Sequence, residues 1–414
     1  MQAKNFSKYL VLTIGYYIAA FVLLFSLLYF KNKISLISNT TFLNWDAAHY
    51  YVVKNNGYDQ INTAFFPLFP FFWKLLHLTP IGIGIVNFGI YTLAVSALLN
   101  ELKLSTLKSF LLLSVPSIYF MFLPYAEAIF FASASIVLIG LRKDSILLCI
   151  LGLFLCSVSR PTTFIFIPAI VFVYYISFIQ GRDRKTIKDT SIKTSIYSFT
   201  LILGLLFSFT IQKLYTGKWF TFFESQSNWG NKLSIPTLPI RTWGGDNITR
   251  LDASAFFIGI CCALTMLLML FIPKFRDKLK FTKPMLFSIA YLAGATGVVL
   301  LYRGGLLFSL NRFIYATPFL LYALGYFISH FSFKLKQVGV LFFTTLVFWL
   351  LFNSYTHIHN FLCFAIVSGI LVLVSFVNNN NKLIATASVI ALIAINNVVA
   401  YYLISKHLSG FWVA

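Results

Sequence analysis

The sequence predicts an all-α polytopic membrane protein with about 13 transmembrane helices, within a range of about 11 to 15. Hydrophobic residues make up 59% of its 414 residues, charged residues only 10%, and the mean hydropathy is +0.84. Soluble domains carry about 25% charged residues and lack apolar runs of about 20 residues. We therefore expect a single integral membrane domain over residues 1–414, with no separate soluble domain.

The first apolar run, at 9–30, follows Lys4 and Lys8 and has no small-residue cleavage site. It predicts a first transmembrane helix rather than a removable signal. Crossing the hydrocarbon core takes about 17 to 25 apolar residues. Further runs near this length lie at 81–100, 107–123, 126–141, 145–159, 161–180, 195–213, 253–273, 284–302, 313–330, 337–353, 357–377 and 383–404.

The net charge of +21 follows the membrane topology and does not indicate nucleic-acid binding. With the N-terminus inside, short inner connectors hold 19 of the 32 Lys and Arg residues, as the positive-inside rule expects. These connectors are 1–8, 101–108, 142–144, 181–193, 274–283, 331–336 and 378–382. The same topology puts two long loops on the outer side, the first at 31–80 and the second at 214–252.

The 11 acidic residues fall into two groups. Those in inner connectors lie among Lys and Arg, so ordinary ion pairing accounts for them: Glu101, Asp144, Asp183, Asp189 and Asp277. Of the acids expected outside, Asp46, Glu127 and Glu224 are flanked by apolar or aromatic residues. An ionised carboxylate in such surroundings needs a partner or a function.

Asp46 is the strongest of these candidates, and it lies in the stretch "NWDAAHYYVVKNNGY" of the first loop. We expect Asn44 to cap a short helix from Trp45, so that Asp46 lies in its first turn near the positive end of the dipole. His49 and Tyr50 then follow on the same face. A base that is ionised near neutral pH requires the helix end and nearby cations to outweigh desolvation by the aromatic residues.

The segment "AFFPLFP" follows this helix. Pro67 and Pro70 leave backbone carbonyls unpaired, which at membrane depth is tolerated only where protein or a cavity surrounds them. We expect an interfacial helix followed by a re-entrant aromatic segment. The alternative is an aromatic belt that anchors the loop at the membrane surface.

Three arginines, Arg160, Arg303 and Arg312, lie beside apolar spans on the side that holds Asp46. A cationic side chain at helix depth costs about 2.5–3.5 kcal/mol unless it is compensated. Guanidinium groups can hold a phosphate by two hydrogen bonds at once, so their grouping favours an anionic ligand. For each arginine alone, the alternative is a side chain that reaches to the lipid headgroups.

The second outer loop carries "KWFTFFESQSNWGN", in which Gln226 and Trp229 can hydrogen-bond and stack on a sugar. The alternative is again an interfacial aromatic anchor. No carboxylate accompanies His357 and His359, and no DxD motif is present, so we expect no metal site.

Taken together, these stretches resemble the PIG-V-like mannosyltransferases, a branch of the GT-C superfamily of membrane glycosyltransferases. The first pair of matching stretches is specific to that family, and the others follow in its order from about residue 44 to residue 325. The matching stretches are "NWDAAHYYVVKNNGY", "AFFPLFPFFWKLL", "PYAEAIFFASAS", "SRPTTFIFIPAI", "FFESQSNWG" and "NRFIYATPFLLYALG".

The resemblance implies an inverting transferase that moves a sugar, usually mannose, from a polyprenyl-phosphate donor to an acceptor hydroxyl on the non-cytoplasmic face. The acceptor is a glycan, a glycolipid or a protein, and the enzyme lies in the bacterial plasma membrane or the endoplasmic reticulum. The resemblance assigns the catalytic base to Asp46. With no metal or other cofactor, Arg160 and Arg312 would stabilise the leaving phosphate, and Arg303 is a further candidate.

Sugar or acceptor contacts are expected from aromatic and polar residues of the matching stretches. These are Trp45, His49, Tyr50, Tyr125, Glu127, Gln226 and Trp229. His49 departs from the family pattern, in which we expect aromatic or polar residues at this position, so it is not assigned an essential role. Tyr125 and Glu127 could instead orient an arginine.

Two other functions stay open. A transporter or flippase of an anionic lipid or solute would need charge on both sides of the membrane, whereas the unusual charges gather on one side. A catalytically silent scaffold of the same fold is the other, and the intact Asp46 weighs against it.

Overall fold

The computed structural model describes residues 2–31, 33–181, 184–242, 246–330, 339, 369–370 and 372–413. Regular structure in these ranges is helical, and strand-like pairing is limited to one isolated bridge between Arg241 and Leu306. The α-helices are α1 (Gln2–Phe30), α2 (Asp46–Asn56), α3 (Leu68–Leu76), α4 (Pro80–Leu102), α5 (Thr106–Leu113), α6 (Glu127–Lys143), α7 (Ile146–Ser159), α8 (Thr163–Gly181), α9 (Arg184–Thr216), α10 (Thr221–Asn228), α11 (Asp246–Phe271), α12 (Pro273–Lys278), α13 (Lys283–Tyr302), α14 (Leu310–Tyr315), α15 (Pro318–His330) and α18 (Lys382–Leu408). Four 3₁₀ helices are η1 (Ile34–Leu36), η2 (Thr41–Leu43), η3 (Asn62–Ala64) and η4 (Pro116–Phe122).

Seven of the described helices are long and apolar enough to cross a bilayer, namely α1, α4, α8, α9, α11, α13 and α18. An eighth span results if η4 and α6, which meet at a bend of 108°, cross together. These helices indicate an integral membrane protein of the all-α class. The count of 13 spans stays a prediction.

Two predicted spans are broken in the structure. The run at 107–123 divides into α5 and η4, because Pro116 cannot continue the hydrogen bonding of α5. The run at 313–330 divides into α14 and α15 immediately before Pro318, which disfavours helical geometry at the preceding residue. The run at 145–159 is the 14-residue helix α7. The run at 337–353 lies outside the described residues except for residue 339, and the run at 357–377 is described only at 369–370 and 372–377.

Polar caps fix where several helices begin. Thr79 Oγ1 accepts a hydrogen bond from the Gly82 amide at 3.1 Å at the start of α4. Ser145 does the same for α7, and Asn381 accepts from Leu383 at the start of α18. These side chains satisfy amides that have no partner inside the helix, so the local sequence sets the start of each helix.

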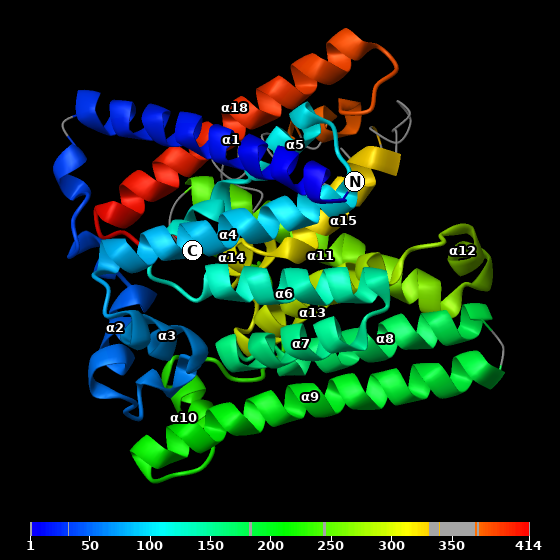
Figure 1. Cartoon of the computed structure of the whole chain (residues 1–414), viewed down its shortest axis with the longest axis horizontal. Helices are drawn as coiled ribbons and strands as arrows, with labels where there is room; N and C mark the ends of the chain where they lie inside the picture. Colours follow the sequence, from blue (N-terminus) through cyan, green and yellow to red (C-terminus); the bar gives the residue numbers. More distant parts are fainter. Residues whose placement is uncertain are drawn as a thin grey trace.

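The predicted inner connectors meet at one end of the molecule. Asp144 pairs with Lys193 at 2.6 Å and with Lys283 at 2.7 Å, which joins three of these connectors. Figure 1 shows α12 at this end, whereas α2, α3 and α10 gather at the opposite end. The pairing expected for four acids is confirmed, and Asp183 lies outside the described residues; the four are Glu101, Asp144, Asp189 and Asp277.

The two predicted outer loops pack against each other at the opposite end. Ser225 Oγ of α10 donates to the Ile61 carbonyl at 2.7 Å, and Thr63 Oγ1 donates to the Thr221 carbonyl at 3.0 Å. Gln212 Nε2, near the end of α9, donates to the Thr63 carbonyl at 2.8 Å. The second loop therefore positions the first loop, which carries Asp46.

Helices α6 and α7 approach each other at glycines. A Cβ atom at Gly152 would lie 2.8 Å from the Ser133 carbonyl oxygen, and one at Gly140 would lie 2.9 Å from the Cys149 amide. Small residues at such contacts let helix backbones pack closely in membranes. This packing fixes α6 relative to α7, and the two helices carry Glu127 and Arg160 at their site ends.

Replacing Gly152 with Ala is expected to destabilise the protein by about 1–3 kcal/mol, because the added methyl group overlaps backbone atoms of α6. The matched control is Gly89→Ala in α4, where an added Cβ meets no atom within 4 Å. The control should be neutral or mildly stabilising, since alanine favours helix more than glycine. Thermal unfolding in detergent measures both, and equal melting temperatures would contradict the close contact.

Candidate functional site

Four charged side chains from distant parts of the chain meet at the end that holds α2. Asp46 Oδ2 accepts a hydrogen bond from Arg312 Nη1 at 2.6 Å. Arg312 Nε donates to Glu127 Oε1, and Arg160 Nη1 lies 3.2 Å from the same oxygen. The residues come from the start of α2, the start of α6, the end of α7 and α14. We call these four residues the acid–arginine cluster.

Glu127 lies at the centre of the acid–arginine cluster, and its side chain is fully buried. Burial of an isolated carboxylate costs several kcal/mol, and its ion pairs and hydrogen bonds must offset that cost. Two guanidinium groups and the positive end of α6 offset that cost. Glu127 Oε2 is nevertheless buried without a hydrogen bond, and the ion-paired Arg160 Nη1 also lacks one. The cluster therefore contains one donor and one acceptor that are buried without a hydrogen-bond partner among the described residues.

The backbone at Trp45 turns Asp46 toward the cluster. Trp45 has φ 60° and ψ −126°, a conformation that costs a non-glycine residue about 1–3 kcal/mol. The expectation that Asn44 caps α2 is wrong, because Asn44 Nδ2 instead donates to the His407 carbonyl at 2.8 Å. The Asn44 carbonyl accepts from Tyr125 at 3.2 Å, so contacts on both sides of the peptide hold this turn in place.

Two aromatic rings pack against the guanidinium group of Arg312. Its guanidinium carbon lies 4.7 Å from the ring centre of Tyr125 and 5.1 Å from that of Phe120. Cation–π contacts of this kind stabilise a desolvated arginine by about 2 kcal/mol. Tyr125, which was expected to touch a sugar or orient an arginine, is fully buried and takes the second role.

Asp252 anchors the helix that carries Arg312, a role that the sequence did not reveal. Its Oδ1 accepts from the Asn311 amide at 2.8 Å and from Asn311 Nδ2 at 2.9 Å, and its Oδ2 accepts from Thr242. Asp252 was assigned to polar loop sequence, whereas the structure buries it completely in the first turns of α11. No sequence signal distinguished it from the other acids of the predicted second loop.

Arg303 lies near the acid–arginine cluster without joining an ion pair in it. Its Nε donates to Asn231 Oδ1 at 3.1 Å, and its Nη1 donates to the Phe308 carbonyl. Burial lowers the pKa of its guanidinium to about 10, and the charges of Asp252 and Asp46 partly offset that effect. Arg303 therefore ties the second loop to the turn before α14.

His49 and Trp229 form an aromatic shelf beside Asp46. The His49 ring stacks on Phe65 with ring centres 4.9 Å apart, and Trp229 packs edge-on at 5.0 Å. His49 Nδ1 lies 2.7 Å from Asn62 Oδ1, and Asn62 Nδ2 donates to Asp59 at 2.8 Å. This network assigns the proton to Nδ1, so Nε2 of the neutral ring is an acceptor.

The remaining predicted site residues differ in how far their side chains are exposed. Trp45 is 42% exposed and packs edge-on against Trp412, so its ring can meet a ligand. Tyr50 is buried among Phe65 and Phe69, where its ring cannot stack on a sugar. Burial raises the pKa of Tyr50, and the nearby negative charge of Glu127 contributes. Gln226 is half-buried, and its Oε1 accepts from Asn231.

The acid–arginine cluster is electrically balanced, because it contains two carboxylates and two guanidinium groups. Arg312 holds the Asp46 carboxylate by a hydrogen-bonded ion pair, and the Asp46 side chain remains 16% exposed. Arg312 is therefore committed to two carboxylates, which leaves Arg160, 11% exposed, as the arginine best placed to meet an anion.

Among the residues that the structure describes, no three His, Cys, Asp or Glu side chains lie close enough to hold a metal ion. His357 and His359 lie outside those residues. No protein-family model, curated protein or solved structure matches this chain.

Glu127→Gln is expected to destabilise the protein by about 3–5 kcal/mol, because it leaves two arginines without their shared counter-charge. The matched control is Glu101→Gln, at the opposite end, where the partners Arg142 and Lys143 are solvent-exposed. That change should cost about 1 kcal/mol or less. Thermal melts of both variants in one detergent decide the matter, and a similar loss for both would refute the central role of Glu127.

Proposed function

We propose that the chain is a glycosyltransferase of the GT-C type that takes a sugar, mannose in our proposal, from a polyprenyl-phosphate donor. The acceptor is a hydroxyl group on the non-cytoplasmic face of the membrane, and no metal takes part. The observation that carries the proposal is the partly exposed Asp46 carboxylate, held by Arg312 beside an aromatic shelf. The resemblance to PIG-V-like mannosyltransferases, which rests on the same residues, supports it.

The proposed reaction is a single in-line displacement. The acceptor oxygen attacks the anomeric carbon of the sugar while Asp46 takes the proton of that hydroxyl. The bond from the anomeric carbon to the phosphate oxygen breaks, and the lipid phosphate leaves with the electron pair. One displacement inverts the anomeric centre, and it needs one carboxylate at that bond rather than the pair that hydrolases use.

Arg160 and Arg312 have different tasks in this mechanism. Arg160, whose side chain is 11% exposed, binds the phosphate group of the donor before and during its departure, and so contributes to the affinity for the donor. Arg312 positions Asp46 by its hydrogen bond, and Arg303 adds positive charge nearby. The exposed rings of Trp45 and Trp229 offer stacking contacts for a sugar.

Asp46→Asn is expected to lower the rate of sugar transfer by about 10²- to 10⁴-fold, because the amide cannot accept the proton. The assay mixes membranes that contain the protein with radiolabelled polyprenyl-phosphate-mannose and measures label in products other than the donor. Glu224→Gln is the matched control, since Glu224 is an exposed carboxylate of the second loop. Its rate should be unchanged.

Transfer that continues undiminished in Asp46→Asn would remove the base assignment, and loss of transfer in His49→Ala alone would move it to His49. Movement of labelled donor across vesicles without any new product would instead support the transporter alternative. Mass spectrometry of the product identifies the sugar and the acceptor.

Arg160→Lys is expected to raise the KM for the lipid donor about tenfold, because lysine loses the forked donor geometry of the guanidinium group. The Asp46 ion pair is untouched, so kcat should change much less. Arg142→Lys, at the opposite end of the molecule, is the matched control. An unchanged KM in Arg160→Lys would exclude Arg160 from the phosphate site.

A further inference from the structure

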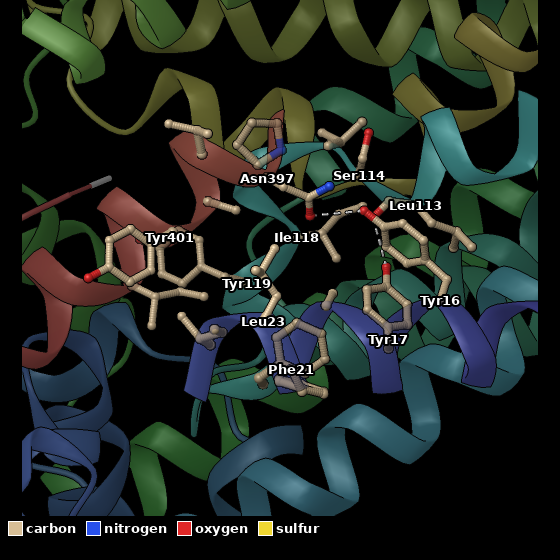
Figure 2. Close-up of a pocket in the computed structure, with 18 of the residues that line it drawn as sticks. Tyr16, Tyr17, Phe21, Leu23, Leu113, Ser114, Ile118, Tyr119, Asn397 and Tyr401 are labelled. Atoms are coloured by element: carbon tan, nitrogen blue, oxygen red, sulfur yellow. Dashed lines mark hydrogen bonds between the residues drawn. The ribbon is translucent and has the colours of Figure 1, made fainter. Parts of the chain in front are cut away.

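An apolar crevice lies between α1 and α18, separate from the acid–arginine cluster. Its volume is about 340 Å³, and η4 forms its floor (Figure 2). Leu23, Leu24 and Leu27 of α1 face Val398 and Ile404 of α18 across it. The flanking helices are the least buried of the seven candidate spans, at 11% for α1 and 17% for α18. The crevice is therefore bordered by helices that face the hydrocarbon of the bilayer.

The length of the crevice matches one leaflet of a membrane. Its lining on α1 runs from Tyr16 to Leu27, which is about 16 Å of helix. Half of the hydrocarbon core is about 15 Å. The inner end is closed by hydrogen-bonded polar groups, among them Tyr16, whose hydroxyl donates to Asn397 at 3.1 Å (Figure 2). An acyl chain of one leaflet fits this length.

A second hollow of about 250 Å³ lies at the other end of the crevice, and Tyr401 lines both. Its lining includes three cations, Lys31, Lys33 and Lys406, together with the hydroxyls of Ser405 and Ser409. No carboxylate lines it, and none of the three lysines forms an ion pair with another described residue. We call Lys31, Lys33 and Lys406 the lysine triad.

The lysine triad lies where two candidate spans end, since α1 ends at Phe30 and α18 at Leu408. Cations at helix C-termini also complement the helix dipole, which is a purely structural explanation. That explanation accounts for the charges but not for the hollow between them or for the leaflet-long crevice that continues from it. Positive charge at the end of an apolar crevice, at headgroup level, is complementary to an anionic lipid.

We propose that this crevice and the lysine triad form a binding site for an anionic phospholipid of the outer leaflet. The phosphate group lies among Lys31, Lys33 and Lys406, and one acyl chain fills the crevice toward Tyr16. The site is distinct from the proposed donor site and does not depend on the proposed function. It adjoins the acid–arginine cluster at the end of α18, where the His407 carbonyl accepts from Asn44, and along η4, whose Phe120 ring packs against Arg312.

The test is native mass spectrometry of the purified full-length protein, titrated with phosphatidylglycerol or with phosphatidylcholine of the same acyl chains. The protein should retain phosphatidylglycerol in preference to phosphatidylcholine. Lys31→Ala, Lys33→Ala and Lys406→Ala combined should weaken phosphatidylglycerol binding on the order of 100-fold, given what each lysine contributes near a lipid headgroup. The control removes the same charge at the opposite end, with Lys274→Ala, Lys278→Ala and Lys280→Ala, and should bind as the unmodified protein does.

A second variant tests the crevice while leaving the lysines in place. Ala20→Trp fills the space between α1 and α18, and it should also reduce phosphatidylglycerol retention by at least tenfold. Equal retention of the two lipids, or undiminished binding by the lysine variant, would overturn the proposal. Displacement of phosphatidylglycerol by equimolar inorganic phosphate or polyprenyl phosphate would overturn the phospholipid assignment. Because this experiment measures lipid binding, a negative result would not change the interpretation of the transferase assay.

Discussion

The architecture at the end of the molecule that holds α2 depends on one buried carboxylate. Glu127 is fully enclosed at the start of α6, and it attracts a guanidinium group from α7 and another from α14. Those cations are themselves too costly to bury alone, so each element can dock only with the others in place. Arg312 then extends the network to Asp46, which places the first loop over the helix ends. The electrostatic balance of this cluster thus determines tertiary structure and the position of the proposed base together.

The residues that hold this cluster in place take no direct part in the proposed reaction. Asp252 fixes α14 through two hydrogen bonds from Asn311 and also accepts one from Thr242. Tyr125 donates to the Asn44 carbonyl while its ring lies against Arg312. The strained backbone of Trp45 is retained because the contacts on either side determine its geometry. A site built in this way is rigid before any ligand arrives, which favours stabilisation of a transition state over adaptation to a substrate.

The end of the molecule that holds α2 thus contains two charged sites of different character. The acid–arginine cluster is balanced in charge and largely buried, which is compatible with the proton transfer and the departure of a phosphate that we propose. The lysine triad has only positive charge and opens onto an apolar crevice, which suits retention of a lipid. Both lie near the ends of candidate spans, where apolar chains and charged headgroups are adjacent in a membrane.

The sequence by itself determined the helical class, seven of the 13 predicted spans and the grouping of basic connectors, because hydrophobic run length and charge are local properties. It also identified candidate site residues, since charged residues within apolar stretches are rare. These are Asp46, Glu127, Arg160 and Arg312. Only the tertiary structure decided which of them touch, that Asn44 holds α18 rather than caps α2, and that Asp252 is buried. Partner choice depends on contacts between residues as many as 363 positions apart, and no local pattern encodes them.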